Sequence, residues 1–173
     1  LGNNIPDYWN GLINGVSGAD MITLFDASKF RTKFACEVKG FDPVAFLDRK
    51  EARKIDRFTQ FALYVSDQAM TDAGLHKDNI NPDRVGVVFG SGIGGLITFQ
   101  HEVIEFAKGD GTPRFNPFFI PKMILDIAAG QISMRHNLRG PNFAVVSACA
   151  SSTNAIMDAF NLIRLGKADI ILS

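Results

Sequence analysis

Apolar residues along the chain follow two kinds of pattern. Largely apolar runs, typical of strands buried on both faces of a sheet, occur at residues 85–89, 143–148 and 168–172, and the first of them is continuous. Between them, apolar side chains at helical spacing predict helices over residues 96–107, 121–137 and 153–165. Strands that alternate with helices in this way predict an α/β layered fold whose sheet is covered on both faces.

The first third of the chain gives weaker signals. Asn4 can cap a helix that runs to about residue 14, where Gly15 ends it, and residues 34–38 are a short strand candidate. Residues 48–73 predict one long helix closed by Gly74. The buried face of that helix is expected to consist of apolar side chains three and four residues apart: Phe58, Ala62, Val65, Ala69 and Ala73.

Composition narrows the class of protein. Of 173 residues, 46% are hydrophobic and 21% charged, which fits an ordered globular chain. Lys plus Arg and Asp plus Glu are both 18, and this absence of a basic excess argues against nucleic acid as the main partner. No apolar run approaches the roughly 20 residues of a membrane-spanning helix, and no secretory signal is visible. We therefore expect a cytoplasmic protein without a membrane partner.

Cysteine and histidine usage points away from disulfides and metals. Two cysteines, Cys36 and Cys149, cannot form a disulfide framework, and a reducing compartment is the simpler interpretation. The histidines His76, His101 and His136 share no metal-ligand spacing with each other or with the cysteines. We predict neither a metal site nor a bound cofactor.

The strongest chemical signal is Cys149, which lies where a buried strand runs directly into a helix. The unpaired N–H groups and partial positive charge of a helix N-terminus favour thiolate over thiol, and they can hold the oxyanion formed when a thiolate attacks a carbonyl. Small neighbours leave room for a substrate, and Ser147 and Asn154 can cap or orient the turn. The alternative is a buried cysteine acting as a small hydrophobe, and the residues alone leave both interpretations open. Cys36, in the short strand, is interpreted as structural.

Three further stretches allow more than one interpretation. Gly90 to Gly95 contains G-x-G-x-x-G between a strand and a helix, as in dinucleotide-binding sites, but the acid expected about 20 residues later falls near Asp110, in a loop. We favour a glycine-lined wall that something approaches closely. The basic run 49–57 is either a solvated helix face or a docking site for an acidic partner. Phe118 and Phe119 belong to a core or interface, or line an apolar tunnel.

Taken together, four segments resemble one family, the β-ketoacyl-ACP synthases, which are the condensing enzymes of fatty-acid synthesis. Residues 146–152 (VSACASS) are similar to the nucleophile motif of that family. Residues 90–95 (GSGIGG), 116–121 (NPFFIP) and 138–141 (LRGP) match in order and spacing. The glycine and PFFIP segments look most like synthase II, the elongating type, and the resemblance covers essentially all of residues 1–173.

The resemblance implies a thiolase-like fold of two similar halves. Each half is an α-β-α layered unit with a mixed, mostly parallel sheet, and the enzyme is a homodimer. Residues 1–173 would be the N-terminal half, with the first strand and the C-terminal half lying outside this chain. The partners implied are acyl-ACP and malonyl-ACP, where ACP is the acyl carrier protein.

The resemblance also assigns roles. Cys149 would take the acyl group as a thioester, its backbone N–H forming half of the oxyanion hole, and a carbanion from decarboxylated malonyl-ACP would then attack to give β-ketoacyl-ACP. Ile93 would gate the acyl pocket, and Phe119 would line it across the dimer interface. The family's catalytic histidines, its lysine and the second oxyanion donor belong to the C-terminal half, and none of the three histidines here matches them. We therefore expect the chain alone not to condense malonyl and acyl groups.

Three other hypotheses remain at this stage. A chain-length factor, a related subunit that does not condense, usually lacks the nucleophile, so Cys149 argues against it. A nucleotide-binding α/β module would use the Gly90–Gly95 loop, and saturable NAD binding would support it. A thiolase-type acyltransferase shares the fold and a cysteine nucleophile, and it would prefer thioesters of coenzyme A to those of ACP.

Overall fold

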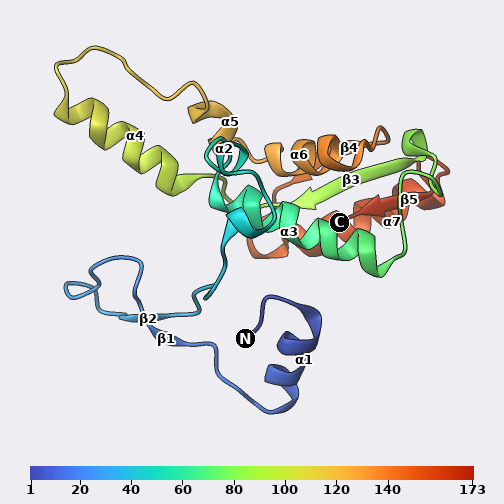
Figure 1. Cartoon of the computed structure of the whole chain (residues 1–173), viewed down its shortest axis with the longest axis horizontal. Helices are drawn as coiled ribbons and strands as arrows, with labels where there is room; N and C mark the ends of the chain where they lie inside the picture. The colour runs from blue at the N-terminus through green and yellow to red at the C-terminus, as the bar shows by residue number, and fades with distance from the viewer. The chain divides into compact units, whose positions relative to one another are not determined.

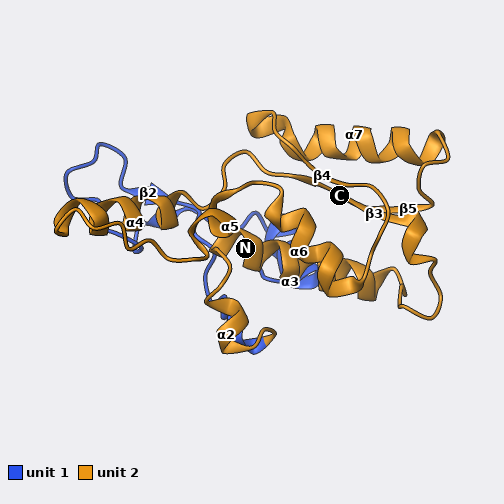
Figure 2. Cartoon of the chain, turned by 90° about the horizontal axis from the view of Figure 1, so that it is seen from above, with its two compact units in different colours: residues 1–45 blue, residues 46–173 orange.

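The computed structural model describes all 173 residues and divides them into two compact units, residues 1–45 and 46–173 (Figures 1 and 2). The first unit holds α1 (Ile5–Ile13), β1 (Asp20–Met21), β2 (Phe34–Ala35) and a 3₁₀ turn (Pro43–Ala45). The second unit holds the main sheet and six helices. None of the helices has the length and apolar character needed to span a bilayer.

The first unit confirms one prediction and shortens another. Helix α1 is capped as expected, since the Asn4 side chain accepts the N–H of Asp7 at 2.9 Å. The strand predicted over residues 34–38 is only β2, paired antiparallel with β1, which the pattern did not predict. Beyond β2, the Glu37 carboxylate accepts hydrogen bonds from the hydroxyl and backbone N–H of Thr23. At Glu37, where the predicted strand would have continued with backbone hydrogen bonds, the side chain forms the bonds instead.

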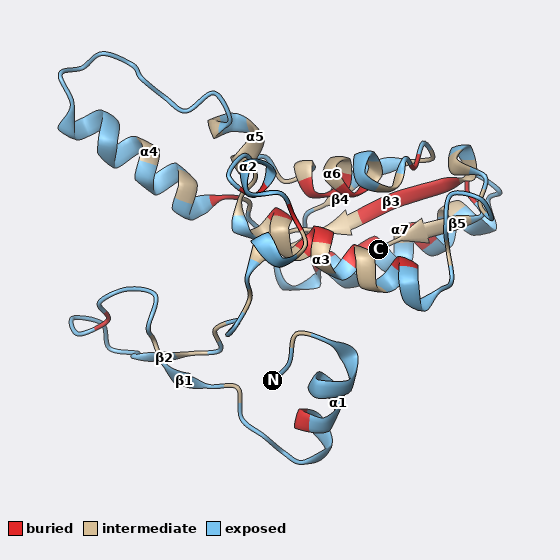
Figure 3. Ribbon diagram, in the orientation of Figure 1, coloured by how far each residue is buried: buried red, intermediate tan, exposed pale blue.

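The second unit is built on a parallel three-stranded sheet in the order β4-β3-β5, which confirms the predicted α/β class. Strand β3 (Val85–Gly90) lies in the centre, with β4 (Asn142–Val145) and β5 (Ile170–Leu172) on either side. Only β3 is buried as the apolar runs predicted (Figure 3). The flanking strands are half-buried or exposed, because each has a single neighbour in the sheet, and both are shorter than predicted.

Helices cover both faces of this sheet (Figure 2). Helix α7 (Ser151–Arg164) lies on one face, and α3 (Arg57–Asp72) and α6 (Ile127–His136) lie together on the other. The largest buried cluster lies on the α3 and α6 side, and its buried members are Leu47, Ala52, Ala62, Leu63, Val85, Val87, Ala128, Ala129, Ile132 and Leu138. On the α7 side the buried residues are small, with Ala155 and Ala159 one helical turn apart, so this helix can approach β3 closely.

The long helix predicted over residues 48–73 is wrong in two respects. It is divided into α2 (Arg49–Ala52) and α3, because the Asp56 carboxylate accepts the N–H of Phe58 at 3.2 Å and so begins a new helix. Its buried face is also different: Val65, Ala69 and Ala73 are exposed. Only Ala62 is shared with the predicted set among the buried residues Thr59, Ala62, Leu63, Ser66 and Met70.

The helix predicted over residues 121–137 is likewise divided, into α5 (Phe119–Met123) and α6. Ile124 is extended between them, so the apolar pattern continues across a break in the backbone. Before α5, α4 (Leu96–Lys108) extends away from the sheet and has no buried residue (Figures 1 and 3). The Phe106, Phe115 and Phe119 rings form a row along this arm, with centroids 5.3 and 5.6 Å apart.

One buried group in α3 gives a stability prediction. Thr59 is fully buried and its hydroxyl has no hydrogen-bond partner. Because an unsatisfied buried hydroxyl is unfavourable, Thr59→Val is expected to raise the free energy of unfolding by about 1 kcal/mol in urea denaturation. Thr71→Val in the same helix is the control, since the Thr71 hydroxyl donates to the backbone of Asp67 in an exposed position. A loss of stability in Thr59→Val would contradict the prediction.

Candidate active site

Cys149 is exposed on a tight turn that joins β4 to α7. The chain leaves β4 at Val145, passes through a short 3₁₀ helix (Ala148–Ala150), and enters α7 at Ser151. The thiol therefore stands two residues before the first residue of a 14-residue helix. The structure thus agrees with the predicted strand-to-helix junction and does not support the alternative of a buried packing cysteine.

The turn is held in a strained conformation. Ala148 has φ of +50°, in the left-handed region that residues other than glycine rarely occupy. Around it, the N–H of Ser147 donates to Ser151 Oγ at 2.9 Å, and Ser151 Oγ donates to the carbonyl of Ala148 at 2.7 Å. Asn154 Nδ2 donates to Ser147 Oγ at 2.7 Å. The orienting role expected of Ser147 and Asn154 therefore agrees with these bonds.

The sequence did not predict the bonding role of Ser151. It is buried, and its hydroxyl both accepts from one side of the turn and donates to the other. The only available signal was a serine at the first position of a helix, a place where hydroxyls often bond to nearby backbone. A serine at this position is too common in helices to identify Ser151 from the sequence alone as a residue that holds the turn.

The start of α7 provides the positive environment expected beside a nucleophile. Its capping residue is Ala150, which has no side chain to accept the first N–H groups of the helix. The N–H of Ser151 donates to the carbonyl of Ala148, but no side chain caps the N–H groups that follow, and these keep the partial positive charge of a helix N-terminus close to Cys149. An oxyanion that develops next to the thiol would be stabilised there.

The glycine loop, residues 90–95, lies directly against this turn. A Cβ on Gly90 would stand 2.6 Å from backbone atoms of Ser151 and Ser152, and one on Gly92 would stand 3.6 Å from the carbonyl of Ala148. The N–H of Ser91 donates to the carbonyl of Val145 at 3.1 Å, which joins the two loops. The structure thus brings the Cys149 turn and the glycine loop together.

The same loop does not look like a dinucleotide site. Asp110, the acid at the spacing of the fingerprint, lies beyond the far end of α4, a helix of 13 residues and so about 20 Å long. Its carboxylate accepts the N–H of Thr112 at 2.9 Å and lies 3.3 Å from the Arg114 guanidinium. The close contact of glycine and backbone agrees with the favoured interpretation, a wall that another segment approaches.

Ile93 and Phe119 occupy different positions relative to the turn. Ile93, in the glycine loop, is 71% exposed and is free to face a substrate. Phe119, at the start of α5, is half-buried, and its ring stacks on Phe115 and on Phe99. Helix α5 reaches the glycine loop at its other end, where carbonyls of Lys122 and Met123 contact the backbone glycines 94 and 95. The loop is therefore shared by the Cys149 turn on one side and α5 on the other.

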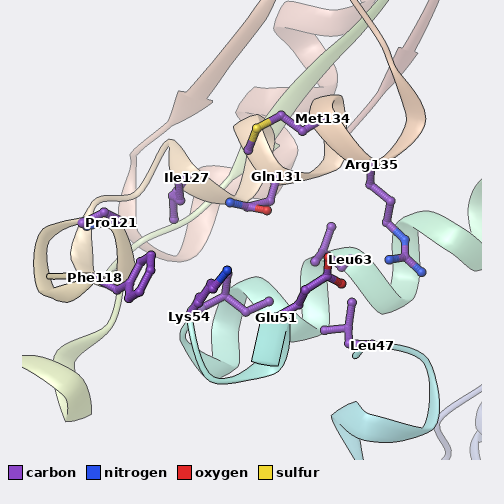
Figure 4. Close-up of a pocket in the computed structure, with 11 residues that line it drawn as sticks. Leu47, Glu51, Lys54, Leu63, Phe118, Pro121, Ile127, Gln131, Met134 and Arg135 are labelled. Atoms are coloured by element: carbon purple, nitrogen blue, oxygen red, sulfur yellow. The ribbon is translucent and has the colours of Figure 1, made fainter. Parts of the chain in front are cut away.

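The cavity shown in Figure 4 lies elsewhere. It has a volume of about 490 Å³ and lies between α2, α3, α5 and α6, with Phe118, Lys54 and Arg135 among its walls. None of Cys149, Ile93 and Phe119 lines it. This cavity is not part of the candidate active site.

The remaining candidates are a cysteine of the first unit and three histidines of the second. Cys36, interpreted from sequence as a structural strand residue, is instead exposed and follows β2, because that strand ends one residue earlier. His76 follows α3 and His101 is on α4, both exposed. His136 ends α6, where Nε2 lies 3.3 Å from Asp67 Oδ1 and 3.3 Å from Ser66 Oγ. Because Ser66 already donates to the carbonyl of Leu63, Nε2 is the donor in this group.

His136 makes stability depend on pH. Burial lowers its pKa, Asp67 raises it and Arg135 lowers it, and the net effect is a pKa below the ordinary value for histidine, so the folded chain binds this proton less readily than the unfolded chain. The unfolded chain binds a proton near pH 6.5, so the contribution is complete above that pH and is lost as the pH falls further. We expect the free energy of unfolding to fall between pH 7 and pH 5, and His136→Gln to flatten this slope. An unchanged slope in the variant would contradict the assignment.

Comparison with known proteins supports the same family as the motifs. Residues 1–173 match the family model described as the β-ketoacyl synthase N-terminal domain. The chain is 44% identical to 3-oxoacyl-[acyl-carrier-protein] synthase 2 of Synechocystis sp., over 99% of this chain and 41% of that protein. It is 40% identical to the protein of the same name from Staphylococcus aureus, over 100% of this chain and 42% of that protein. It therefore spans about two fifths of the length of these relatives.

A solved structure agrees on the fold. The ishigamide ketosynthase/chain length factor superposes with a TM-score of 0.87 and 24% identity, covering 99% of this chain and 43% of that one. This superposition supports the fold, and the match of the family model over the whole chain supports the family that the motifs resemble. The chain belongs to the β-ketoacyl synthase family, whose N-terminal domain it matches from residue 1 to residue 173.

Proposed function

We propose that this chain carries the acyl-accepting part of a β-ketoacyl-ACP synthase of the elongating, synthase II type, an acyltransferase of fatty-acid synthesis. The observation that carries the proposal is the exposed Cys149 thiol on a strained turn directly before the uncapped start of α7. Both cysteines are free thiols, which suits the reducing conditions of the cytoplasm.

In the proposed first step, the Cys149 thiolate attacks the carbonyl carbon of an acyl-ACP thioester. A bond forms between that carbon and Sγ, and the carbonyl electrons move onto oxygen, where the N–H of Cys149 and the start of α7 stabilise the charge. When the tetrahedral intermediate collapses, the bond to the carrier's sulfur breaks. That sulfur takes up the proton that Cys149 lost, and the acyl group stays on Cys149 as a thioester.

Ile93 and Phe119 are proposed to shape the acyl site. The exposed Ile93 side chain sits on the loop that contacts the Cys149 turn, so a shift of this loop would change the room for an acyl chain. Phe119 would line the pocket of the other protomer in a homodimer. Exposed apolar residues run along α4, including Leu96, Ile97 and Phe99, and a second copy of the chain would cover such a surface.

The basic run is proposed as the surface that receives the carrier protein. Arg49 and Lys50 lie in α2, Arg53 and Lys54 follow directly, and Arg57 begins α3. All five are exposed, and the acids within the run are Glu51 and Asp56. Charge on an exposed helix raises the rate at which an oppositely charged partner associates. An acidic face of acyl-ACP or malonyl-ACP would fit this surface.

Condensation itself is proposed to need residues outside this chain. The decarboxylation of malonyl-ACP and the attack on the Cys149 thioester would use the histidines, the lysine and the second oxyanion donor expected in the C-terminal half. We therefore predict that the purified chain forms no β-ketoacyl product from malonyl-ACP and acyl-ACP, measured by mass spectrometry of the carrier. Detectable product would contradict this prediction.

Acyl transfer tests the proposal directly. The chain is incubated with a medium-chain acyl-ACP, its folding is checked by circular dichroism, and adducts are mapped by peptide mass. We expect a thioester on Cys149 and none on Cys36, although both thiols are exposed. A folded chain without an adduct on Cys149 would contradict the claim that these residues suffice for acylation.

Two alternatives have their own signatures in related assays. Saturable binding of NAD, followed by the fluorescence of Trp9, would favour a nucleotide-binding module that uses Gly90 to Gly95. A preference of Cys149 for acyl coenzyme A over acyl-ACP would favour a thiolase-type acyltransferase. The contacts of the glycine loop with the Cys149 turn favour the synthase.

A further inference from the structure

Asp56 bonds to two helix N-termini at once. One carboxylate oxygen, Oδ1, accepts the N–H of Phe58 at the start of α3. The other, Oδ2, accepts the hydroxyl of Thr98 in the first turn of α4 at 2.5 Å. Helix α4 has no cap of its own, because its capping residue is Gly95. The carboxylate of Asp56 therefore supplies the negative charge that the start of α4 lacks.

Asp56 is also in contact with the glycine loop itself. Gly95 is buried, and a Cβ there would stand 2.9 Å from Asp56 Oδ2. On the other side of this end of the loop, Gly94 and Gly95 contact the carbonyls of Met123 and Lys122 in α5. The end of the loop, one and two residues after Ile93, is thus held between one carboxylate and α5.

We propose that Asp56 is a positioning residue for the acyl site: its bond to Thr98 fixes the Gly90–Gly95 loop and with it the Ile93 side chain. The contacts alone indicate that Asp56 holds the loop. The effect on which acyl chains are accepted rests on the function proposed above. Asp48 offers an instructive contrast, since it caps α2 through the same local bond, to the N–H of Lys50 at 2.7 Å. Asp56 adds to such a cap a bond to a second helix.

Two substitutions separate this role from simple helix capping. Asp56→Ser keeps a good capping residue for α3, but its single short hydroxyl does not reach Thr98. Thr98→Val removes only the hydroxyl, from the other side of the bond, with the shape of the side chain retained. The control is Thr71→Val, which makes the same change in α3 where Thr71 donates to the Asp67 backbone.

The first readout is hydrogen exchange of the loop. In Asp56→Ser and in Thr98→Val, amide exchange over residues 91–98 is expected to rise about tenfold, with exchange in β3 (Val85–Gly90) unchanged as the check on folding. The double variant is expected to match either single one, because both remove the same bond. Unchanged exchange in the loop, or additive effects, would overturn the proposal.

The second readout is acyl selectivity. Rates of Cys149 acylation are compared for hexanoyl-ACP and myristoyl-ACP, and the ratio of the two rates is expected to move about tenfold toward one in both variants. The Thr71→Val variant keeps the wild-type ratio. A loosened loop with an unchanged ratio overturns the link to the acyl site. If the wild-type chain is not acylated at all, the proposed function fails, and the exchange data still decide whether Asp56 holds the loop.

Discussion

Replacing Cys149 by serine is expected to lower the rate of acyl transfer to the chain at least about a thousandfold. A serine hydroxyl at this position hardly ionises near neutral pH, and the turn offers it no adjacent base among the residues that hold it. The fold should be unaffected because the side chain is exposed. The rate is measured by mass spectrometry of the intact chain after incubation with acyl-ACP.

Cys36 provides the matched control for this substitution. It is the other exposed free thiol, in the first unit and outside the site described around α7. Cys36→Ser is expected to leave the rate of acyl transfer within about twofold of wild type. Equal losses in the two variants would mean that acylation is a general reaction of exposed thiols, and a fully active Cys149→Ser would exclude Cys149 as the nucleophile.

The turn that carries Cys149 could be located from sequence because its main signal is local. A buried strand, a run of small residues and a helix follow one another without a gap around Cys149, and local patterns of this kind survive folding. The bonds that stabilise the turn are different, since Ser151 acts through its exact distance to Ser147 and to the Ala148 carbonyl. Nothing in the order of residues specifies those distances.

The fold was predicted best where burial alone decides the structure. Strand β3 lies at the centre of the sheet, and its apolar run gave both its position and its burial. The helices predicted over residues 48–73 and 121–137 failed where other contacts compete with the apolar pattern. At Asp56 the carboxylate caps α3 through the N–H of Phe58 and also bonds to Thr98 in α4, and after Met123 the end of α5 lies against the glycine loop.

The glycine loop was recognised as unusual, but its use could not be derived from the spacing of its glycines. The same G-x-G-x-x-G spacing allows either a phosphate group or a second segment of backbone to approach the loop closely. Coordinates separate the two, since the space beside Gly90 is filled by the start of α7. Because a Cβ at residue 90 would collide with the start of α7, both the fold and the proposed active site require glycine at this position.

Gly90→Ala is accordingly expected to destabilise the chain by about 3 kcal/mol. The added Cβ would stand 2.6 Å from backbone atoms of Ser151 and Ser152, closer than atoms of this kind approach, and backbone cannot move aside as a flexible side chain can. The start of α7 has to shift, and Cys149 shifts with it. Acyl transfer in the fraction that remains folded is expected to fall about tenfold or more.

The control is Gly130→Ala, the same change in a position where space is open. Gly130 lies within α6, and a Cβ there would meet nothing within 4 Å, so alanine should stabilise the helix by about 0.5–1 kcal/mol. Urea denaturation gives the free energy of unfolding of both variants. If the same added methyl group destabilises the chain at Gly90 and stabilises it at Gly130, the close approach of α7 to β3 is what the stability depends on. A Gly90→Ala chain as stable and as readily acylated as wild type would show that the start of α7 has another position available to it.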